Sequence, residues 1–319
     1  MRVAITGSLG VNGVFVVRSL RNAGVEILAT NSIEDYSLAP DLAGKLNFRI
    51  ADVTDQSALK SVLRDFRPDV IIHLAAILPV EAQADPYRGY AVNIMGTANV
   101  LAVARDLDVA RVVFTSSKAA YGEVTGIYAH PTYKPLTEDD AVHPKNIYDH
   151  AKVASECLGL NYQRCGGPEF AALRFATIFG PGKVGKHGPM SQISGIVEDA
   201  VAGRPVRIRQ GGDQGDDYIY VRDAATAIVA IALHKRPLPH AIYNVGSGVA
   251  RTLFHFADIL RGLVPSADIE IGPGLDPMGF GVSYYSALNS DRAKEDFGFE
   301  VPELAAALRD YVQILRERT

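Results

Sequence analysis

The sequence of 319 residues predicts an α/β fold: a doubly wound parallel sheet with helices on both faces, followed by a smaller C-terminal lobe. Two observations carry this prediction. Short apolar strands alternate with helical segments through the first half of the chain, which is typical of strands buried on both faces. The first strand, Val3-Ala4-Ile5, also runs directly into a glycine-rich turn that opens a helix, as the first βα unit of such folds does.

The other elements of the sheet follow this strand in order. A helical pattern runs from 13 to 23, and Gly24 ends it. Further strands are expected at 25–29, 48–51, 70–74 and 111–115, and helices at 56–66 and 87–105. The segment 122–146 has no periodicity and contains three X-Pro pairs. Because loops this long are usually functional, we place it at the rim of the site, ahead of a helix expected over 147–165.

Segments after Arg174 are shorter and richer in glycine and proline, which indicates a smaller lobe that covers the substrate. We expect a dinucleotide-binding domain over 1–175 and a mainly substrate-binding lobe over 176–319. Within the second part, about 217–245 is expected to return to the sheet, through segments at 217–221, 224–233 and 242–245. An amphipathic helix over 303–317 should close the chain.

Bulk composition excludes several classes of protein. The net charge of −4 gives no reason to expect a nucleic-acid partner. The longest apolar runs fall short of the ~20 residues that a membrane helix needs, and the N-terminus enters a strand rather than a signal peptide. Cys157 and Cys165 are expected to be reduced packing residues. No cluster has the spacing of metal ligands, so we expect a cytoplasmic protein without a metal.

Gly7, Gly10 and Gly13 predict a dinucleotide site of the Rossmann type. The first glycine allows a tight turn, the second lets the backbone approach a pyrophosphate, and the third allows helix and strand to pack closely. The helix N-terminus then attracts the phosphates. A structural turn without a ligand is the alternative, and the position of the turn after the first strand argues against it.

The end of the second strand normally carries an acid that binds the ribose 2′-hydroxyl. Here it reads Thr30-Asn31-Ser32, with neither an acid nor the basic residue that a 2′-phosphate would need. We therefore expect NAD, with NADP still open. Asp52 and Val53 follow the third strand and are expected at the adenine ring. The alternative role for Asp52 is to cap the next helix.

Tyr148 and Lys152 stand four residues apart, on one face of a predicted helix. A tyrosine with a pKa near ~10 needs about 3 units of help to ionise at neutral pH, or ~4 kcal/mol. An ammonium ~4 Å away supplies about that much at an effective dielectric of ~20. Ser117, at the end of the fifth strand, is placed to hold the substrate oxygen. The alternative is an exposed helix pair beside a capped turn, and His73 is expected to be a satisfied core or rim histidine.

At this point the sequence resembles the extended short-chain dehydrogenases/reductases, in the epimerase/dehydratase branch. The resemblance covers nearly the whole chain through TGSLGVNG, ADVTD, IIHLAA, VNIMGTANVL, VVFTSSKAAYG, YDHAK, ALRFATIFGPG and YNVGSG. It implies that Ser117, Tyr148 and Lys152 are the catalytic hydroxyl, the base and its activating lysine, which also holds the nicotinamide ribose. It implies a homodimer with a four-helix interface built from 87–105 and 147–165.

The motifs and the resemblance together predict a full set of cofactor-binding residues. They are Gly7, Gly10, Val11, Asn12, Gly13, Asn31, Ser32, Asp52, Val53, Leu74, Ala75, Ala76, Asn93, Thr115, Tyr148, Lys152, Phe175 and Thr177.

Four departures from the family pattern bear on the substrate. Dehydratases carry an acid pair after the catalytic hydroxyl residue, whereas Lys118-Ala119 follow Ser117 here. Nucleotide-sugar epimerases carry a diphosphate-binding arginine where this chain has Asp216, and a carboxylate there would repel a diphosphate. A later arginine of the family is replaced by the apolar stretch 277–281, and Thr177 stands where sugar-active members often have asparagine.

The sequence therefore predicts an NAD(P)-dependent oxidoreductase that moves a hydride between nicotinamide and a secondary alcohol or ketone without a nucleotide handle. A sugar, sugar acid, hydroxy acid or apolar alcohol would fit. The alternatives are a sugar or nucleotide-sugar epimerase with tightly bound cofactor and a non-catalytic nucleotide-sensing protein, which would not need a base. Candidate pocket positions are Glu123, Tyr128, Phe175, Lys183, His187, Met278 and Phe280.

Overall fold

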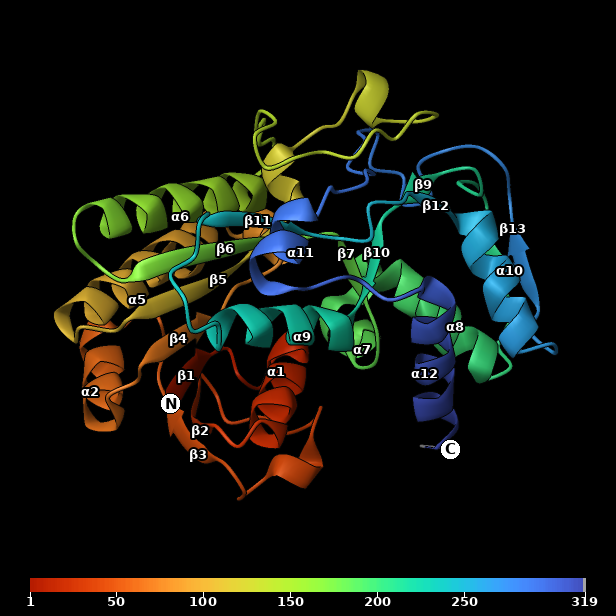
Figure 1. Cartoon of the computed structure of the whole chain (residues 1–319). Coiled ribbons are helices and arrows are strands. Elements are labelled where there is room, and N and C mark those ends of the chain that lie inside the picture. The colour runs from red at the N-terminus through yellow and green to blue at the C-terminus, as the bar shows by residue number, and fades with distance from the viewer. Residues whose placement is uncertain (318–319) are drawn as a thin grey trace.

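The computed structural model describes residues 1–317, and a seven-stranded parallel sheet forms its centre (Figure 1). The strand order is β11-β6-β5-β4-β1-β2-β3. The strands are β1 (Arg2–Thr6), β2 (Glu26–Asn31), β3 (Asn47–Ile50), β4 (Val70–His73), β5 (Arg111–Ser117), β6 (Glu169–Phe175) and β11 (Ile242–Val245). The predicted doubly wound parallel sheet is confirmed.

Helices cover both faces of this sheet because successive strand residues point to opposite sides. Val3 and Ile5 belong to the larger core cluster, which includes α1 (Val11–Asn22) and α9 (Val221–Ala232). Ala4, between them, belongs to a second cluster under α2 (Gln56–Phe66) and α5 (Gly96–Asp106). Two separate apolar layers therefore hold the sheet, which explains why its strands read as continuous apolar runs.

The helix expected over 87–105 is present, but its middle turn is not α-helical. It is built from α4 (Pro86–Tyr90), a π-helical turn (Ala91–Met95) and α5, and α3 (Pro79–Ala84) precedes it. The turn carries Asn93, whose side chain is buried. Single π-helical turns are often found at functional sites.

The smaller lobe contains three two-stranded sheets. They pair β7 (Thr177–Phe179) with β10 (Tyr218–Tyr220), β9 (Gly215–Asp216) with β12 (Arg251–Thr252), and β8 (Val206–Ile208) with β13 (Ile269–Ile271). Its helices are α7 (Lys183–His187), α8 (Gln192–Val201), α10 (Leu253–Leu263) and α12 (Leu304–Arg316). Helix α11 (Asp291–Phe297) lies between α10 and α12 in the chain, but it packs against β11 of the main sheet.

Residues 217–245 reach the main sheet through one strand, β11. The segment 217–221 was expected there too, but it forms β10 beside β7. The change of partner occurs at Ala176: its N–H bonds to the carbonyl of Val245, whereas the N–H of Thr177 bonds to that of Asp217. One residue after β6, the chain has therefore left the main sheet and entered the smaller lobe.

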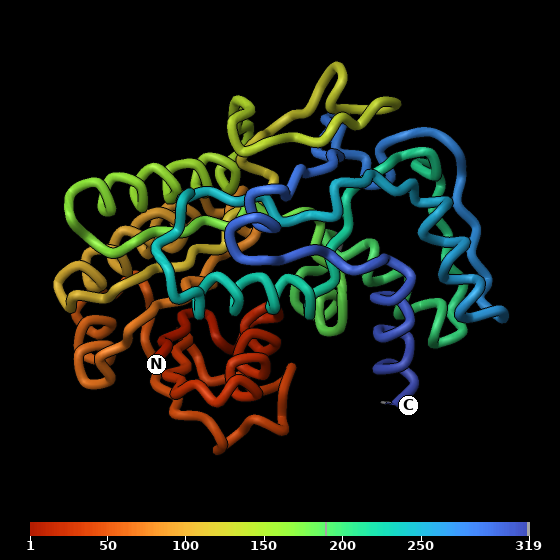
Figure 2. Tube along the Cα trace, in the orientation of Figure 1, coloured from red at the N-terminus to blue at the C-terminus, as the bar shows by residue number. Residues whose placement is uncertain are grey.

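The predicted rim segment 122–146 contains one 3-10 turn (Gly126–Tyr128) and isolated β-bridges at Gly122, Leu136 and His143, and it lies along the residues before α11. Val124 N–H donates to the carbonyl of Ser283 at 2.8 Å, and Leu136 N–H to that of Ala287 at 2.9 Å. Figure 2 shows the yellow-green segment over the top of the molecule, next to the blue one. These contacts join the rim to the smaller lobe just ahead of α6 (Ile147–Arg164).

Both cysteines are free and exposed. The expectation that Cys157 and Cys165 pack in the interior is therefore wrong, because both side chains project from the solvent side of α6 and its C-terminal end. Among residues 1–317, no helix is both long and apolar enough to span a membrane.

Candidate active site

The glycine turn leaves no room for side chains at two positions. Gly7 has a φ of +72°, and a Cβ on it would lie 2.7 Å from the backbone nitrogen of Ala75. A Cβ on Gly13 would lie 2.3 Å from the carbonyl oxygen of Gly7. Gly10 caps α1 without any side-chain hydrogen bond, so the first N–H groups of this helix are open to an anion.

One polar atom in this turn supports a ligand directly. The Oδ1 of Asn12 is buried and has no hydrogen-bond donor, the one such side-chain atom among the residues described. Buried acceptors are nearly always paired, so a donor from a ligand or a water is expected there. The backbone cradle, this acceptor and the Leu74–Ala75 backbone that meets Gly7 fit a dinucleotide such as NAD.

The expected adenosine end lies at the carboxyl ends of β2 and β3. Asn31 is half-buried and Ser32 is exposed, and the Asn31 amide donates to the carbonyl of Ile33. Asp52 is exposed, and its Oδ1 accepts bonds from the N–H and hydroxyl of Thr54, both at 2.8 Å. The alternative that Asp52 caps α2 is wrong, because Asp55 accepts from Ala58 N–H at that cap.

Asn93 and His73 are satisfied within the protein. The amide of Asn93 exchanges two hydrogen bonds, each of 2.9 Å, with the backbone of Ile77, and so holds the loop that follows β4. His73 lies between the hydroxyls of Thr6 and Thr97, at 2.7 and 3.0 Å. Burial, with a smaller effect of the Lys152 charge, lowers the pKa of His73 to about 3. The interpretation of His73 as a satisfied core residue is confirmed.

Ser117, Tyr148 and Lys152 lie together at the carboxyl end of β5. Tyr148 stands in the first turn of α6, where Asn146 caps the N–H groups of Tyr148 and Asp149. The Ser117 side chain lies near enough to lower the pKa of Tyr148, and its hydroxyl oxygen accepts from Ala119 N–H at 3.1 Å. One turn later, the ammonium of Lys152 is 5.2 Å from the centre of the Tyr148 ring and donates to the carbonyl of Thr115 at 2.6 Å.

The electrostatics of this group follow from burial. Burial raises the pKa of Tyr148 above its usual value and the charge of Asp149 adds to this, while the nearby Ser117 side chain lowers it. Burial also lowers the pKa of Lys152 to about 8, against the opposing effect of Glu156. Lys152 is therefore still mostly charged at neutral pH, beside a phenol that needs a cation to ionise.

A buried ion pair that is not predicted from the sequence joins α6 to the main sheet. Glu156 pairs with Arg174 of β6 at 2.7 and 3.0 Å, and it also accepts a bond of 2.6 Å from the hydroxyl of Ser116. A sequence signal existed: Glu156 stands one further turn after Lys152 on the same face, and Arg174 interrupts an apolar strand. This pair fixes α6 against β5 and β6 at the level of the catalytic residues.

Three of the four departures from the family pattern, at Lys118, Thr177 and Asp216, meet at one place. The ammonium of Lys118 forms an ion pair with Asp216, and the hydroxyl of Thr177 donates to the other carboxylate oxygen at 2.6 Å. Ser286 N–H also donates to Asp216, at 3.2 Å. Asp216 is 3% exposed. A nearly buried charge pair therefore stands beside Ser117, in the region where the resemblance places a diphosphate-binding arginine.

The other candidate pocket residues do not lie together but are distributed over the rim, the core and the smaller lobe. Glu123 pairs with Lys145 on the rim, and the Tyr128 hydroxyl donates to Asp140. Phe175 lies in the core, whereas Phe280 is exposed. Lys183 is buried, and His187 and Met278 are half-buried in the smaller lobe.

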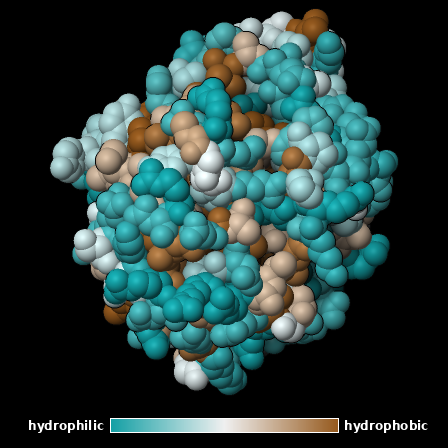
Figure 3. All heavy atoms as spheres, turned by 60° about the vertical axis from the view of Figure 1, so that its left-hand side comes forward, coloured by the Kyte–Doolittle hydropathy of each residue, from teal (hydrophilic) through white to brown (hydrophobic). Residues whose placement is uncertain are grey.

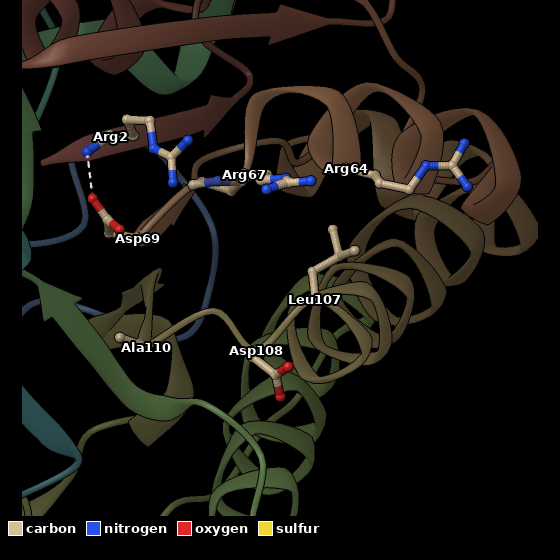
Figure 4. Close-up of a pocket in the computed structure, with 8 residues that line it drawn as sticks. Arg2, Arg64, Arg67, Asp69, Leu107, Asp108 and Ala110 are labelled. Atoms are coloured by element: carbon tan, nitrogen blue, oxygen red, sulfur yellow. Dashed lines mark hydrogen bonds between the residues drawn. The ribbon is translucent and has the colours of Figure 1, made fainter.

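A cavity of about 330 Å³ lies at the opposite edge of the sheet (Figure 4). It is lined by Arg2, Arg64, Arg67, Pro68, Asp69, Leu107, Asp108 and Ala110. These residues lie at the amino ends of β1, β4 and β5, whereas doubly wound sheets bind ligands at the carboxyl ends. In residues 1–317, no group of acidic, histidine and cysteine side chains has the arrangement of a metal site.

Comparison with known proteins gives consistent matches over nearly the whole chain. The model of the NAD dependent epimerase/dehydratase family matches residues 3–246. The UDP-glucose 4-epimerase of Mycolicibacterium smegmatis is 29% identical over 313 residues, which cover 96% of this chain and 95% of that protein.

Two solved structures share the same fold at full length. The UDP-glucose 4-epimerase of Thermus thermophilus, in complex with NAD, has a TM-score of 0.83 and 26% identity, and each chain is covered completely. The L-threonine dehydrogenase of Clostridium difficile has a TM-score of 0.85 and covers 99% of this chain and 98% of its own, but at 24% identity it shows the fold alone.

Proposed function

Because this chain belongs to the NAD dependent epimerase/dehydratase family and is an NAD-dependent enzyme of the extended short-chain dehydrogenase/reductase type, we propose that it oxidises or reduces a substrate without a nucleotide handle. The reacting group is a secondary alcohol or its ketone, on a sugar, sugar acid, hydroxy acid or apolar alcohol. The cofactor-binding residues named from the sequence are part of this proposal.

The catalytic roles follow from the geometry of three side chains. Ser117 holds the substrate oxygen, and Tyr148 takes the hydroxyl proton. The ammonium of Lys152 lies beside the Tyr148 ring and stabilises the phenolate against the effect of burial. NAD, when bound, supplies the hydride acceptor. In the direction of reduction the same tyrosine returns the proton to the oxygen.

The ion pair between Lys118 and Asp216 is the observation that carries the substrate assignment. Both oxygens of Asp216 already accept bonds, from Lys118, Ser286 and Thr177. A diphosphate would meet this carboxylate instead of a guanidinium. The later stretch 277–281 adds no basic residue, and its backbone is tied to Asp276 at Phe280 and Gly281.

The second candidate is epimerisation of a sugar or nucleotide sugar, favoured by the activity that the names of the relatives state. An epimerase regenerates its own oxidant and keeps its cofactor, whereas a dehydrogenase exchanges it at every turnover. Retention of the cofactor therefore separates the two candidates.

We also propose that the protein is a cytoplasmic homodimer, joined through the face that carries α3 to α6. Five large apolar side chains are exposed there: Val80, Tyr87, Tyr90, Met95 and Leu160. Figure 3 shows brown apolar atoms between hydrophilic ones on the side of the molecule that this view brings forward. Exposed free thiols, as at Cys157 and Cys165, suit a reducing compartment.

The assignment of cofactor binding and substrate binding to separate parts of the chain is also part of the proposal. Residues 1–175 would bind the dinucleotide and 176–319 mainly the substrate, with β11 as the strand that returns to the sheet.

The test begins with the absorbance of the purified protein before and after dialysis, followed by titration with NAD and NADP separately. The proposal expects a cofactor-free protein that binds NAD reversibly and reduces it with a member of a panel of sugar acids, hydroxy acids and secondary alcohols. Cofactor that survives dialysis, together with turnover of UDP-glucose, would replace the proposal with the second candidate. Failure to bind either cofactor would overturn both.

A further inference from the structure

Lys183 has a largely buried side chain, and no partner for its ammonium is found among the described residues. It is 6% exposed, and within residues 1–317 no hydrogen bond or ion pair reaches its Nζ. The other buried charged side chains all have partners; they are Arg111, Asp149, Lys152, Glu156, Arg174, Asp216 and Asp217. Nζ is not one of the fully buried side-chain atoms that lack a partner, so the ammonium at the end of this buried stem reaches solvent-accessible space, where a group from outside the chain can contact it.

The position of Lys183 is fixed by the turn that leaves β7. Gly180 N–H donates to the hydroxyl of Ser194 in α8, at 3.0 Å. Gly182 has a φ of +85° and lies against Leu38, since a Cβ there would be 3.0 Å from the Leu38 Cδ2. Lys183 therefore starts α7 at the junction of α8 and the loop after β2, and the end of β2 is where the adenosine ribose is expected.

The charges around Lys183 are not balanced by the protein. Burial alone lowers its pKa to about 7, with no contribution from a carboxylate. The nearby ionisable group is His187, whose own pKa is lowered to about 3 by burial and by the charge of Lys183. Lys186, one turn further, is already paired with Asp35 at 2.6 Å. The environment thus provides a cation and no anion.

We propose that Lys183 binds an oxyanion, a phosphate or carboxylate group, of a molecule held at the junction of α7, α8 and the loop after β2. This inference rests on the proposed function and deepens it. The oxyanion has two possible sources, the phosphates of the dinucleotide and a carboxylate of the substrate. In the second case, the substrate class narrows to sugar acids and hydroxy acids.

The test uses the full-length variant Lys183→Met, with Lys186→Met as the matched control from the same helix. Methionine keeps the buried stem of the lysine and removes its charge, so the variant is expected to fold at least as stably as the wild type without added anions. Two measurements are made on each protein: the dissociation constant of NADH by fluorescence titration, and the rise in melting temperature with inorganic phosphate and with D-gluconate.

Each outcome decides the inference. Binding of the dinucleotide phosphates predicts NADH affinity about 10- to 100-fold weaker in Lys183→Met, the size expected for a lost charged hydrogen bond, and little change in Lys186→Met. Binding of a substrate carboxylate predicts unchanged NADH affinity and loss of the stabilisation by D-gluconate. If Lys183→Met matches the wild type in both measurements, the inference is wrong, although NADH binding would still support the proposed function. If the wild type does not bind NADH, the proposed function fails, and the phosphate and D-gluconate measurements still decide the role of Lys183.

Discussion

The hydroxyl of Tyr284 donates a hydrogen bond of 3.0 Å to Oδ2 of Asp149, the residue that follows the catalytic Tyr148. Asp149 is 1% exposed and also accepts from Lys145 N–H, at 3.2 Å. The bond connects a loop of the smaller lobe to the first turn of α6. The carboxylate of Asp149, which this bond from the smaller lobe holds in place, therefore lies next to the proposed base. Its negative charge raises the pKa of Tyr148.

Replacing Asp149 by asparagine should shift the pH dependence of alcohol oxidation toward lower pH. Without the neighbouring negative charge the phenolate is easier to form, because a like charge disfavours ionisation. The rate at neutral pH should rise about 3- to 10-fold. The measurement is kcat/KM against pH. Tyr284→Phe keeps the Asp149 charge and should leave the midpoint in place; an unmoved midpoint in Asp149→Asn would show that this charge does not act on the base.

Tyr148→Phe should remove turnover and keep cofactor binding. Loss of the proton acceptor should lower kcat by about 10²–10⁴-fold, while the NADH dissociation constant changes by less than about threefold. Steady-state rates and fluorescence titration check the two parts. Tyr87→Phe, at an exposed tyrosine on α4, is the matched control. Substantial activity in Tyr148→Phe would mean that another group is the base.

Lys152→Met should make the enzyme less active and more stable at neutral pH. Its pKa is lowered to about 8 in the fold from a usual 10.5, so the unfolded chain binds more protons between these values. Stability of the wild type should therefore rise with pH across that window, and the methionine variant should lose this slope. Urea unfolding at pH 7 and pH 10 measures it. Equal slopes in both proteins would contradict the prediction.

Glu156→Gln should destabilise the protein strongly. Arg174 is 5% exposed and would be left as an unpaired buried charge, which typically costs about 3–5 kcal/mol. Asp268→Asn provides the comparison, because it breaks an exposed pair with Arg207 that should contribute no more than about 1 kcal/mol. Urea denaturation gives both values. Similar losses in the two variants would show that burial of the Glu156 pair is unimportant.

Gly10→Ala and Gly13→Ala should fail for different reasons. The backbone of Gly10 (φ −72°, ψ 170°) suits any residue, so its alanine should fold but bind NADH at least about 10-fold more weakly, because the Cβ faces the approach of the pyrophosphate. A Cβ on Gly13 lies 2.3 Å from a backbone oxygen and should cost about 1–3 kcal/mol or more in stability. Gly195→Ala, in open space on α8, is the control for both measurements. Wild-type NADH affinity in Gly10→Ala would argue against this phosphate site.

The spacing of residues along the chain is enough to predict those parts of the site that lie within a single turn or helix. The glycine turn, and the separation of Tyr148 from Lys152, are properties of a turn and of one helical face. The strands of the main sheet were likewise visible because burial on both faces makes them uniformly apolar. The segment 217–221 reads as a strand of the main sheet, but it pairs with β7 in the smaller lobe, because periodicity does not specify a strand's partner.

Relationships between distant segments could not be predicted in this way. Lys118 and Asp216 each depart from the family pattern in the sequence, but only the fold brings them into contact. The missing partner of Lys183 is also a tertiary property, because a lysine in the sequence looks the same whether its ammonium is paired, solvated or buried.

The contacts between the rim and residues 283–288 also set an order of events during synthesis. A nascent chain carries the glycine turn, Ser117, Tyr148 and Lys152 once its first 175 residues exist. The partners of the rim, among them Ser283 and Tyr284, leave the ribosome more than 100 residues later. Because domains form as their residues become available, the nucleotide half can assemble once α9 and β11 have also been made, and the half that meets the substrate is completed only after residues 283–288 have followed.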